Sequence, residues 1–179
     1  MLWGVTSPQL NYEDEMAIEE RFMNLFRGYE LAHGQYRVQT TEADGKKSGR
    51  ALTVSEPATI VNFKEHLSGG EYILGVIMLK KNNSCNFGVI DIDIRGSGKL
   101  NESLESLEKK IRNTPLILCR SKSGGAHLYL FADPEIAAVD MVNKLNEYAA
   151  HLGYGGAEIF PKQISRANDR DRGNWINLC

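Results

Sequence analysis

Long apolar runs are missing from the 179-residue sequence, and this absence limits where the protein can reside. No stretch approaches the roughly 20 consecutive apolar residues that a membrane-spanning helix requires. The opening residues, Met1–Asn11, also lack a basic segment followed by an apolar run, so they do not have the pattern of a signal peptide. We therefore expect a cytoplasmic protein with no membrane partner.

Cysteine is scarce, and the residues present are far apart in the sequence. Cys85, Cys119 and Cys179 form no C-x-x-C pair and have no spacing typical of zinc ligands. An odd number of cysteines without a close pair also argues against a disulfide framework. We therefore predict buried, reduced thiols and no structural zinc.

An excess of positive charge is missing as well. The chain has 21 Lys and Arg residues against 23 Asp and Glu residues, which gives a formal net charge of -2. Proteins held by nucleic-acid phosphates usually carry a basic balance, so any such binding here must depend on local patches. Ordinary apolar and charged contents allow one domain, or two small lobes that share a core.

The first half of the chain predicts a small α/β module, residues 1–85. Apolar residues at helical spacing predict two helices, and short runs of strand-forming residues predict three strands. The expected helices lie at 13–29 and 57–67, and the expected strands at 35–41, 50–54 and 72–79.

The second half, residues 86–179, predicts the element order β-α-β-β-α-β of ferredoxin-like and RRM-like domains. In that arrangement the first strand lies between the third and the fourth. The second helix is expected to start at Asp133, with Pro134 in its first turn, and to stop at Gly153. The first helix would start at Asn101, and the strands would lie at 87–94, 116–119, 126–131 and 157–160. The predicted fold class is α+β.

Two aspartates occupy the first strand of the second module. Asp91 and Asp93 alternate with isoleucines, so both carboxylates share one face with Val89 while the isoleucines pack on the helices. Aspartate is depleted in strands, and two carboxylates this close repel each other unless a cation lies between them. The pattern favours a cation site over a half-exposed strand with solvated acids.

A glycine-containing segment, Ser121–His127, leads into the third strand of this module. Gly124 and Gly125 let backbone N–H groups approach an anion closely, and the serines and Lys122 supply further donors. A glycine hairpin followed by an ordinary histidine is the alternative. The expected neighbourhood of the aspartate strand favours anion binding.

Glu158 begins the fourth strand, on the other flank of the aspartate strand. There it would complete a three-carboxylate cluster with Asp91 and Asp93, although a single glutamate in a strand is usually a surface residue. A basic segment follows, interrupted by Asp169 and Asp171, and a solvated loop with internal ion pairs is its alternative explanation. Its basic residues are Lys162, Arg166, Arg170 and Arg172.

Four motifs in order, Val89–Asp93, Ser121–Tyr129, Glu158–Gln163 and Gly173–Leu178, resemble the archaeo-eukaryotic primase superfamily. The resemblance is closest to the primase-polymerase domains of phages, plasmids, CRISPR-associated loci and TOTE conflict systems. Four motifs with matching order are more specific than any one of them. Shorter similarities lie upstream, at Leu25–Gly28, Glu56-Pro57 and His66-Leu67.

The resemblance implies a role for each matching residue. Asp91 and Asp93 match the metal-binding acidic motif, and Glu158 falls where many relatives carry a third acid, often aspartate. Ser123 and His127 match the Ser-x-x-x-His motif that holds the triphosphate of the incoming nucleotide. Lys122, Gly124, Gly125 and Lys162 would add nucleotide contacts, and Arg166, Arg170 and Arg172 would contact nucleic acid.

The reaction implied by this resemblance is attack of a 3′-hydroxyl on the α-phosphate of a nucleoside triphosphate. Two Mg²⁺ or Mn²⁺ ions per active site would be held by the three carboxylates. The expected partners are a single-stranded DNA template, a primer and nucleoside triphosphates. Relatives continue beyond the Asn-Leu pair, so we also expect a truncated or excised domain with helicase or other modules beyond it.

Two other classes of protein remain open. A non-catalytic RRM-like module would stack bases on Tyr129 and Phe131, where Asp91 and Asp93 would repel phosphate. A different metal-dependent enzyme is the second possibility. A nucleotide cyclase would share the aspartates but not explain the Ser-x-x-x-His run, and a Rep-type endonuclease would need a His-hydrophobic-His motif, which His127 lacks.

Overall fold

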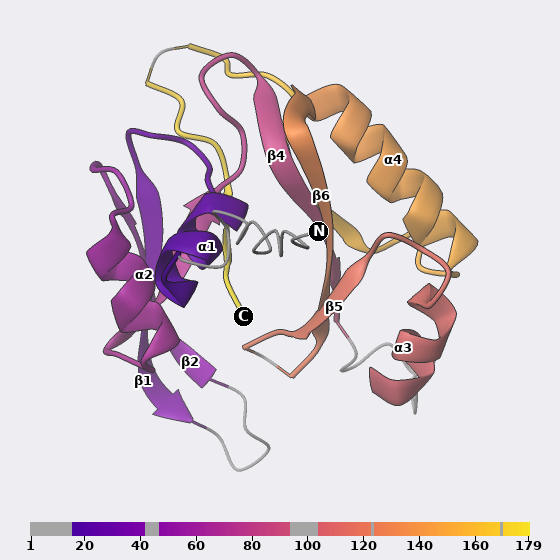
Figure 1. Cartoon of the computed structure of the whole chain (residues 1–179), viewed down its shortest axis with the longest axis horizontal. Coiled ribbons are helices and arrows are strands. Elements are labelled where there is room, and N and C mark those ends of the chain that lie inside the picture. Colours follow the sequence, from indigo (N-terminus) through magenta and orange to yellow (C-terminus); the bar gives the residue numbers. More distant parts are fainter. Residues whose placement is uncertain (1–15, 42–46, 94–103, 123, 169) are drawn as a thin grey trace, which may run out of the picture.

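The structure is a computed structural model that describes residues 16–41, 47–93, 104–122, 124–168 and 170–179. Its mixture of helices and antiparallel sheets confirms the predicted α+β class (Figure 1). Within the described ranges, no helix is both long and apolar enough to cross a membrane. The elements are α1 (Ile18–Leu25), β1 (His33–Thr41), β2 (Lys47–Val54), α2 (Ile60–Leu67), β3 (Tyr72–Ile77), β4 (Ser84–Ile92), α3 (Leu104–Ile111), β5 (Ile117–Arg120), β6 (Ala126–Ala137), α4 (Ala138–His151), β7 (Glu158–Phe160) and β8 (Trp175–Asn177).

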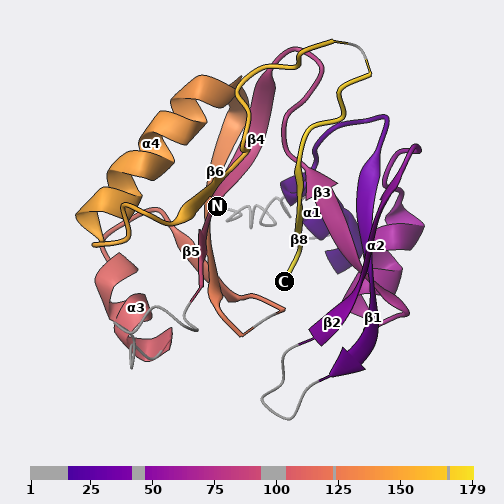
Figure 2. The ribbon, with the colours of Figure 1, turned by 180° about the vertical axis from the view of Figure 1, so that it is seen from behind.

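The second sheet has the strand order β5-β6-β4-β7, with every neighbouring pair antiparallel. Strand β4 therefore lies between β6 and β7, as the β-α-β-β-α-β order predicts for its first strand. Ile90 and Ile92 are buried on the face that packs on α4, where a side chain at Gly88 would collide with Met141 and Leu145. Figures 1 and 2 show α3 and α4 together on the outer side of this sheet.

The first sheet has the order β2-β1-β3-β8. Strand β8 therefore pairs with β3 of the first half of the chain, although it follows every strand of the second sheet in sequence. The chain thus crosses from the second sheet back to the first after β7. The expected boundary between residues 85 and 86 falls inside β4, and β8 lies beyond it in sequence but with the first module in space. The two expected modules are therefore interlocked.

One large apolar core joins the two sheets. Leu74 and Ile176 of the first sheet belong to the same buried cluster as Val89 and Tyr129 of the second. The ring of Phe26, just after α1, lies 5.2–5.4 Å from the rings of three aromatic residues of the second sheet, measured between centroids. These are Phe87, Tyr129 and Phe131. Edge-to-face packing of this kind stabilises the contact between the sheets.

The predicted start of α4 at Asp133 is wrong, because the helix begins at Ala138. Strand β6 continues past Asp133, and its last residue, Ala137, pairs with Ser84. Asp133 forms an ion pair with Arg27 at 3.2 Å instead of capping a helix, and Glu135 pairs with Lys80. Long-range partners thus override a local capping pattern.

Helix α1 is also shorter than predicted, although residues 13–15 of the expected range lie outside the described part. The chain leaves the helix after Leu25 because the backbone N–H of Tyr29 donates to the Ile77 carbonyl of β3, at 2.8 Å. The Cα of Gly28 lies so close to this strand that an added Cβ would stand 2.3 Å from the Ile77 oxygen. Only glycine permits that approach.

Candidate active site

A row of four side chains crosses the second sheet. Asp91 on β4 is the register partner of both Glu158 on β7 and His127 on β6, and His127 is in turn the partner of Cys119 on β5. Residues directly opposite each other on antiparallel strands project to the same face. We name Glu158, Asp91, His127 and Cys119 the transverse row; it lies on the face away from α4.

Asp91 is at the centre of concentrated negative charge. Burial, together with the charges of Glu158 and Asp93, raises the pKa of its carboxyl to about 6. Asp93, directly after the end of β4, is exposed. A half-buried carboxylate flanked by two others is an arrangement that a divalent cation would stabilise.

His127 is buried and held neutral. Burial lowers the pKa of its imidazole to about 4, and the positive charge of Lys122 acts in the same direction. Its Nδ1 lies 3.2 Å from the Tyr129 hydroxyl, and its Nε2 lies 3.6 Å from Asp91 Oδ1. When Tyr129 donates to Nδ1, the proton of the neutral ring is on Nε2, the nitrogen that faces Asp91.

The turn between β5 and β6 packs directly on the end of β4. The Ser121 N–H donates to the Gly125 carbonyl and the Gly124 N–H donates to the Ser121 carbonyl, both at 3.0 Å. A Cβ on Gly125 would stand 2.5 Å from the Ile92 carbonyl oxygen, so the turn reaches this position only with glycine. Ser123 lies outside the described residues.

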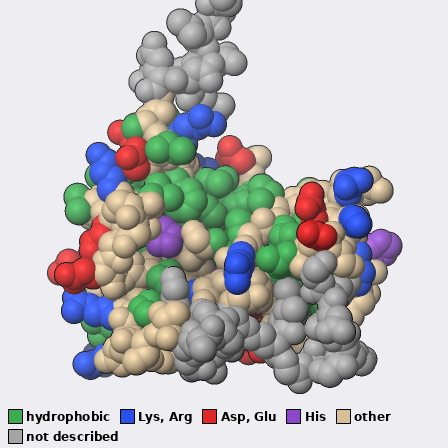
Figure 3. Space-filling view, turned by 90° about the horizontal axis from the view of Figure 1, so that it is seen from below, with side chains coloured by type: hydrophobic (Ala, Val, Ile, Leu, Met, Phe, Trp, Pro, Cys, Tyr) green, Lys and Arg blue, Asp and Glu red, His purple; other side chains and the backbone are tan. Residues whose placement is uncertain are grey.

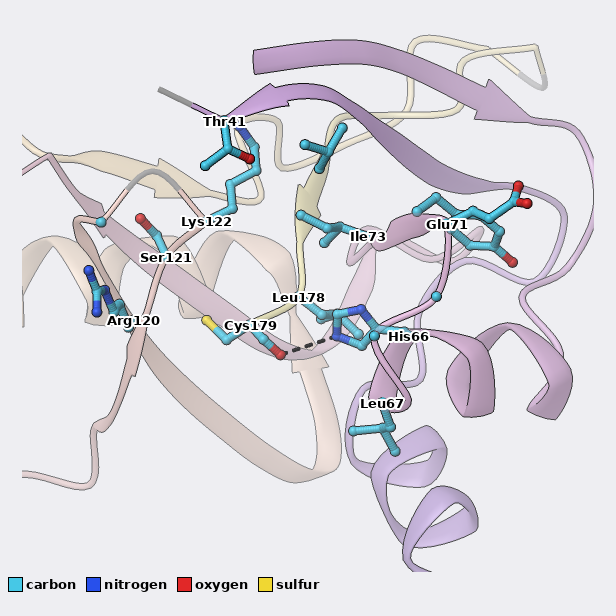
Figure 4. A pocket seen from close by; sticks show the side chains of 15 residues that line it. Thr41, His66, Leu67, Glu71, Ile73, Arg120, Ser121, Lys122, Leu178 and Cys179 are labelled. Atoms are coloured by element: carbon cyan, nitrogen blue, oxygen red, sulfur yellow. Dashed lines mark hydrogen bonds between the residues drawn. The ribbon is translucent and has the colours of Figure 1, made fainter. Parts of the chain in front are cut away.

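A cavity of about 720 Å³ opens beside the transverse row, between the two sheets. Figure 4 shows Arg120, Ser121 and Lys122 on one side and His66, Leu67 and Glu71 on the other. Its volume is in the range of small-molecule sites. Leu178 and Cys179 lie between the two walls, where His66 Nε2 is 3.1 Å from the Cys179 carbonyl oxygen.

A family model described as the archaeo-eukaryotic primase domain of TOTE conflict systems matches residues 20–178. The chain belongs to this family. The match confirms the resemblance predicted from the sequence, and it includes the transverse row, the glycine turn and the residues that line the cavity except Cys179. No curated protein matches this primase domain.

The three acids of the primase domain do not surround a common point. Glu158 is beside Asp91 through strand pairing, but its carboxylate forms an ion pair with Lys162 at 3.1 Å. Across the part of the chain that the structure describes, no three His, Cys, Asp or Glu side chains gather closely enough to hold one metal ion. Lys162 is thus the ion-pair partner of the acid that the sequence predicts as a third metal ligand.

Arg166 has a structural role rather than the predicted exposed one. Its guanidinium donates to the backbone carbonyls of Leu79, Lys80 and Asp171, and it stacks 3.5 Å from the centroid of the Tyr29 ring. These contacts anchor the loop over 161–174 to the segment after β3, and the predicted nucleic-acid contact of Arg166 stays a prediction.

The rest of this loop is ordered by hydrogen bonds. The Asp171 carboxylate accepts the backbone N–H groups of Ala167 and Gly173, at 2.9 and 3.0 Å, and these bonds lower its pKa. Arg172 donates to the Ser55 hydroxyl at the end of β2, whereas Arg170 is exposed. On the face shown in Figure 3, basic side chains are scattered among acidic and apolar ones.

Sequence reasoning missed several residues that line the site. His66, which lines the cavity, was noted only as part of a family similarity and was assigned no role. Tyr36, whose ring centroid lies 4.0 Å from Lys122 Nζ, was not singled out by any sequence pattern. Cys179 lies 3.4 Å from His127 Nδ1, although the two are far apart in sequence. No local pattern could have placed Tyr36 or Cys179 at the site.

Proposed function

We propose that this domain is a primase-polymerase that joins nucleoside triphosphates into a strand directed by a DNA template. The observation that carries this proposal is the position of Asp91, between Glu158 and neutral His127 and within reach of the positive charges of Lys162 and Lys122. Adjacent acidic and donor-rich areas are what a metal-bound triphosphate requires.

The proposed cofactors are two Mg²⁺ or Mn²⁺ ions, because both prefer carboxylate oxygens. Asp91 and Asp93 would hold them, and Glu158 would join only by exchanging Lys162 for the metal. The raised pKa of Asp91 supports this assignment, because a cation would relieve the burial and repulsion that raise it. When bound, such ions lower the pKa of the attacking hydroxyl and neutralise phosphate charge.

The residues around the glycine turn would bind and orient the triphosphate. Lys122 would bind its oxygens, Gly124 and Gly125 would leave room for their close approach, and Ser123 is assigned by family resemblance alone. His127 would donate its Nε2 proton to a phosphate oxygen, and the Lys162 ammonium group would bind the leaving pyrophosphate. Fixed donors of this kind accelerate phosphoryl transfer by positioning and charge stabilisation.

Template and primer are the proposed macromolecular partners, with exposed Arg170 as a phosphate contact in the loop over 161–174. Helicase or other modules in a longer protein would supply further contacts.

The rival hypothesis of a non-catalytic RRM-like binder requires accessible aromatic rings on the sheet face. Tyr129 has no exposed surface, and Phe26 packs against both Tyr129 and Phe131. Tyr129 therefore offers no surface on which a base could stack, and this observation favours the catalytic proposal.

The deciding experiment is primer extension with each nucleotide set, on a primed and an unprimed DNA template, with Mg²⁺ or Mn²⁺. We expect metal-dependent products from the unmodified domain and a loss on the order of 100-fold or more in Asp91→Asn. Asp140→Asn on exposed α4 is the matched control and should extend normally. Equal extension by Asp91→Asn would reject the proposal.

A further inference from the structure

Two cysteines that are distant in the sequence meet at the end of the transverse row. Cys119, on β5, is partly buried, whereas Cys179, just after β8, is exposed. Cys119 is the register partner of His127, whose ring the Cys179 sulfur contacts, so both thiols lie beside the same imidazole. The sulfur of Cys179 also lies 3.4 Å from His127 Nδ1 and 3.5 Å from the Tyr129 hydroxyl.

We propose that Cys119 and Cys179 form a reversible oxidation site, at which a hydroperoxide converts the two thiols to a disulfide. The sequence predicted unpaired, buried thiols. All three thiols are free, and burial is confirmed for Cys85 but not for Cys119 and Cys179. The pairing of β8 with β3 brings Cys179 across to the second sheet.

The chemistry is balanced by hydrogen peroxide as the oxidant. The Cys119 thiolate attacks one peroxide oxygen, the O–O bond breaks, and the departing hydroxide takes up a proton to become water. The resulting sulfenic acid is attacked by the Cys179 sulfur, the S–S bond forms, and the thiol proton leaves with hydroxide as a second water. The two thiols together lose two electrons, which reduce one peroxide.

The two thiols have the complementary properties that this sequence requires. The neighbouring Cys179 thiol lowers the pKa of Cys119, which favours its thiolate and its role as the attacking sulfur. Cys179 has exposed surface and lies beside the His127 imidazole, where it is positioned to resolve the sulfenic acid. Burial raises the pKa of Cys85 to about 12, which makes it an unreactive internal control.

Oxidation would link the two sheets beside the cavity. Leu178 is tied to β3 by its N–H, which donates to the Leu74 carbonyl at 2.8 Å, and Cys119 belongs to β5. A disulfide would draw the Cys179 sulfur toward Cys119 and away from His127 Nδ1. On the proposed function, on which this step rests, oxidation would therefore weaken nucleotide binding, by roughly tenfold for one perturbed donor.

The test treats the reduced 179-residue chain with hydrogen peroxide and measures intact mass, free thiols and the cross-linked peptides. We expect a loss of two hydrogens, a peptide pair joined through Cys119 and Cys179, and full reversal by dithiothreitol. Cys85→Ser should respond like the unmodified chain, whereas Cys119→Ser and Cys179→Ser should not lose the two hydrogens. No such loss in the unmodified chain, or an undiminished loss in Cys119→Ser, would overturn the proposal.

Nucleotide titrations with Mn²⁺ separate this proposal from the proposed function. Weaker binding after oxidation, restored by dithiothreitol and absent in Cys179→Ser, would support both. A disulfide that forms in a chain that binds no nucleotide even when reduced would reject the proposed function and leave the oxidation site standing. A disulfide that forms without changing nucleotide affinity would overturn its coupling to the active site.

Discussion

The two sheets of this primase domain face each other but differ in how their strands are covered. Strand β4 is buried along almost its whole length, and it carries Asp91 at the one half-buried position near its end. Strand β1 is buried only at its start and is exposed toward Thr41, where it lines the cavity. The comparison shows that Asp91 lies on a covered strand, whereas the exposed end of β1 supplies part of the cavity wall.

The largest expected effect is a loss of nucleotide incorporation when the acid directly after β4 is removed. Asp93→Ala should lower nucleotide incorporation by on the order of 100- to 1,000-fold, because it would remove a ligand of the proposed metal. Primer extension measures the effect, and circular dichroism should show an intact fold. Asp140→Ala, on exposed α4, is the control. Comparable incorporation by both variants would show that Asp93 is not needed for the reaction, and it would contradict the proposed metal site at the end of β4.

His127→Ala tests the opposite side of the transverse row. We expect nucleotide affinity to fall by about 10- to 100-fold, the loss of a hydrogen bond to a charged group, with little change in affinity for single-stranded DNA. Paired titrations with nucleotide plus Mn²⁺ and with single-stranded DNA measure the two. The exposed His151→Ala of α4 serves as the control. Loss of DNA affinity with unchanged nucleotide affinity would instead make the turn a template contact.

Arg166→Ala should reduce stability rather than binding. It would leave the carbonyls of Leu79, Lys80 and Asp171 without their donor, at a cost of about 2 kcal/mol. Thermal unfolding should show a fall in melting temperature of about 4–8 °C. Arg170→Ala, exposed in the same loop, should stay within about 0.5 kcal/mol of the unmodified domain. A larger loss of stability in Arg170→Ala than in Arg166→Ala would contradict the structural role of Arg166.

The smallest expected effect is on the stability of the metal-free domain. The folded-state pKa of Asp91, about 6, is above its ordinary value of 3.8, so its contribution is lost as pH rises through 6. Asp91→Asn should therefore melt above the unmodified domain at pH 8 in chelator, and this advantage should shrink by pH 5. Melting curves at the two pH values measure it. An advantage that grows on acidification would contradict the repulsion among the acids.

The sequence alone determined the features that depend on local periodicity. Alternation along a strand put Asp91 on the opposite face from Ile90 and Ile92, and the order of helices and strands predicted that β4 lies between β6 and β7. Together these two inferences were enough to bring Asp91, His127 and Glu158 next to one another, as the strand register has them. Such features follow from residues close in sequence, so no tertiary information was needed.

Only the tertiary structure decided the contacts between residues far apart in the chain. Asp133 does not cap α4 but forms an ion pair with Arg27, and Glu135 forms one with Lys80. Helix α4 begins only at Ala138. In the same way β8 pairs with β3 and brings Cys179 to His127. The partners of each group lie far away in the chain and cannot be identified from its neighbours in sequence, so only the folded structure shows which contacts form.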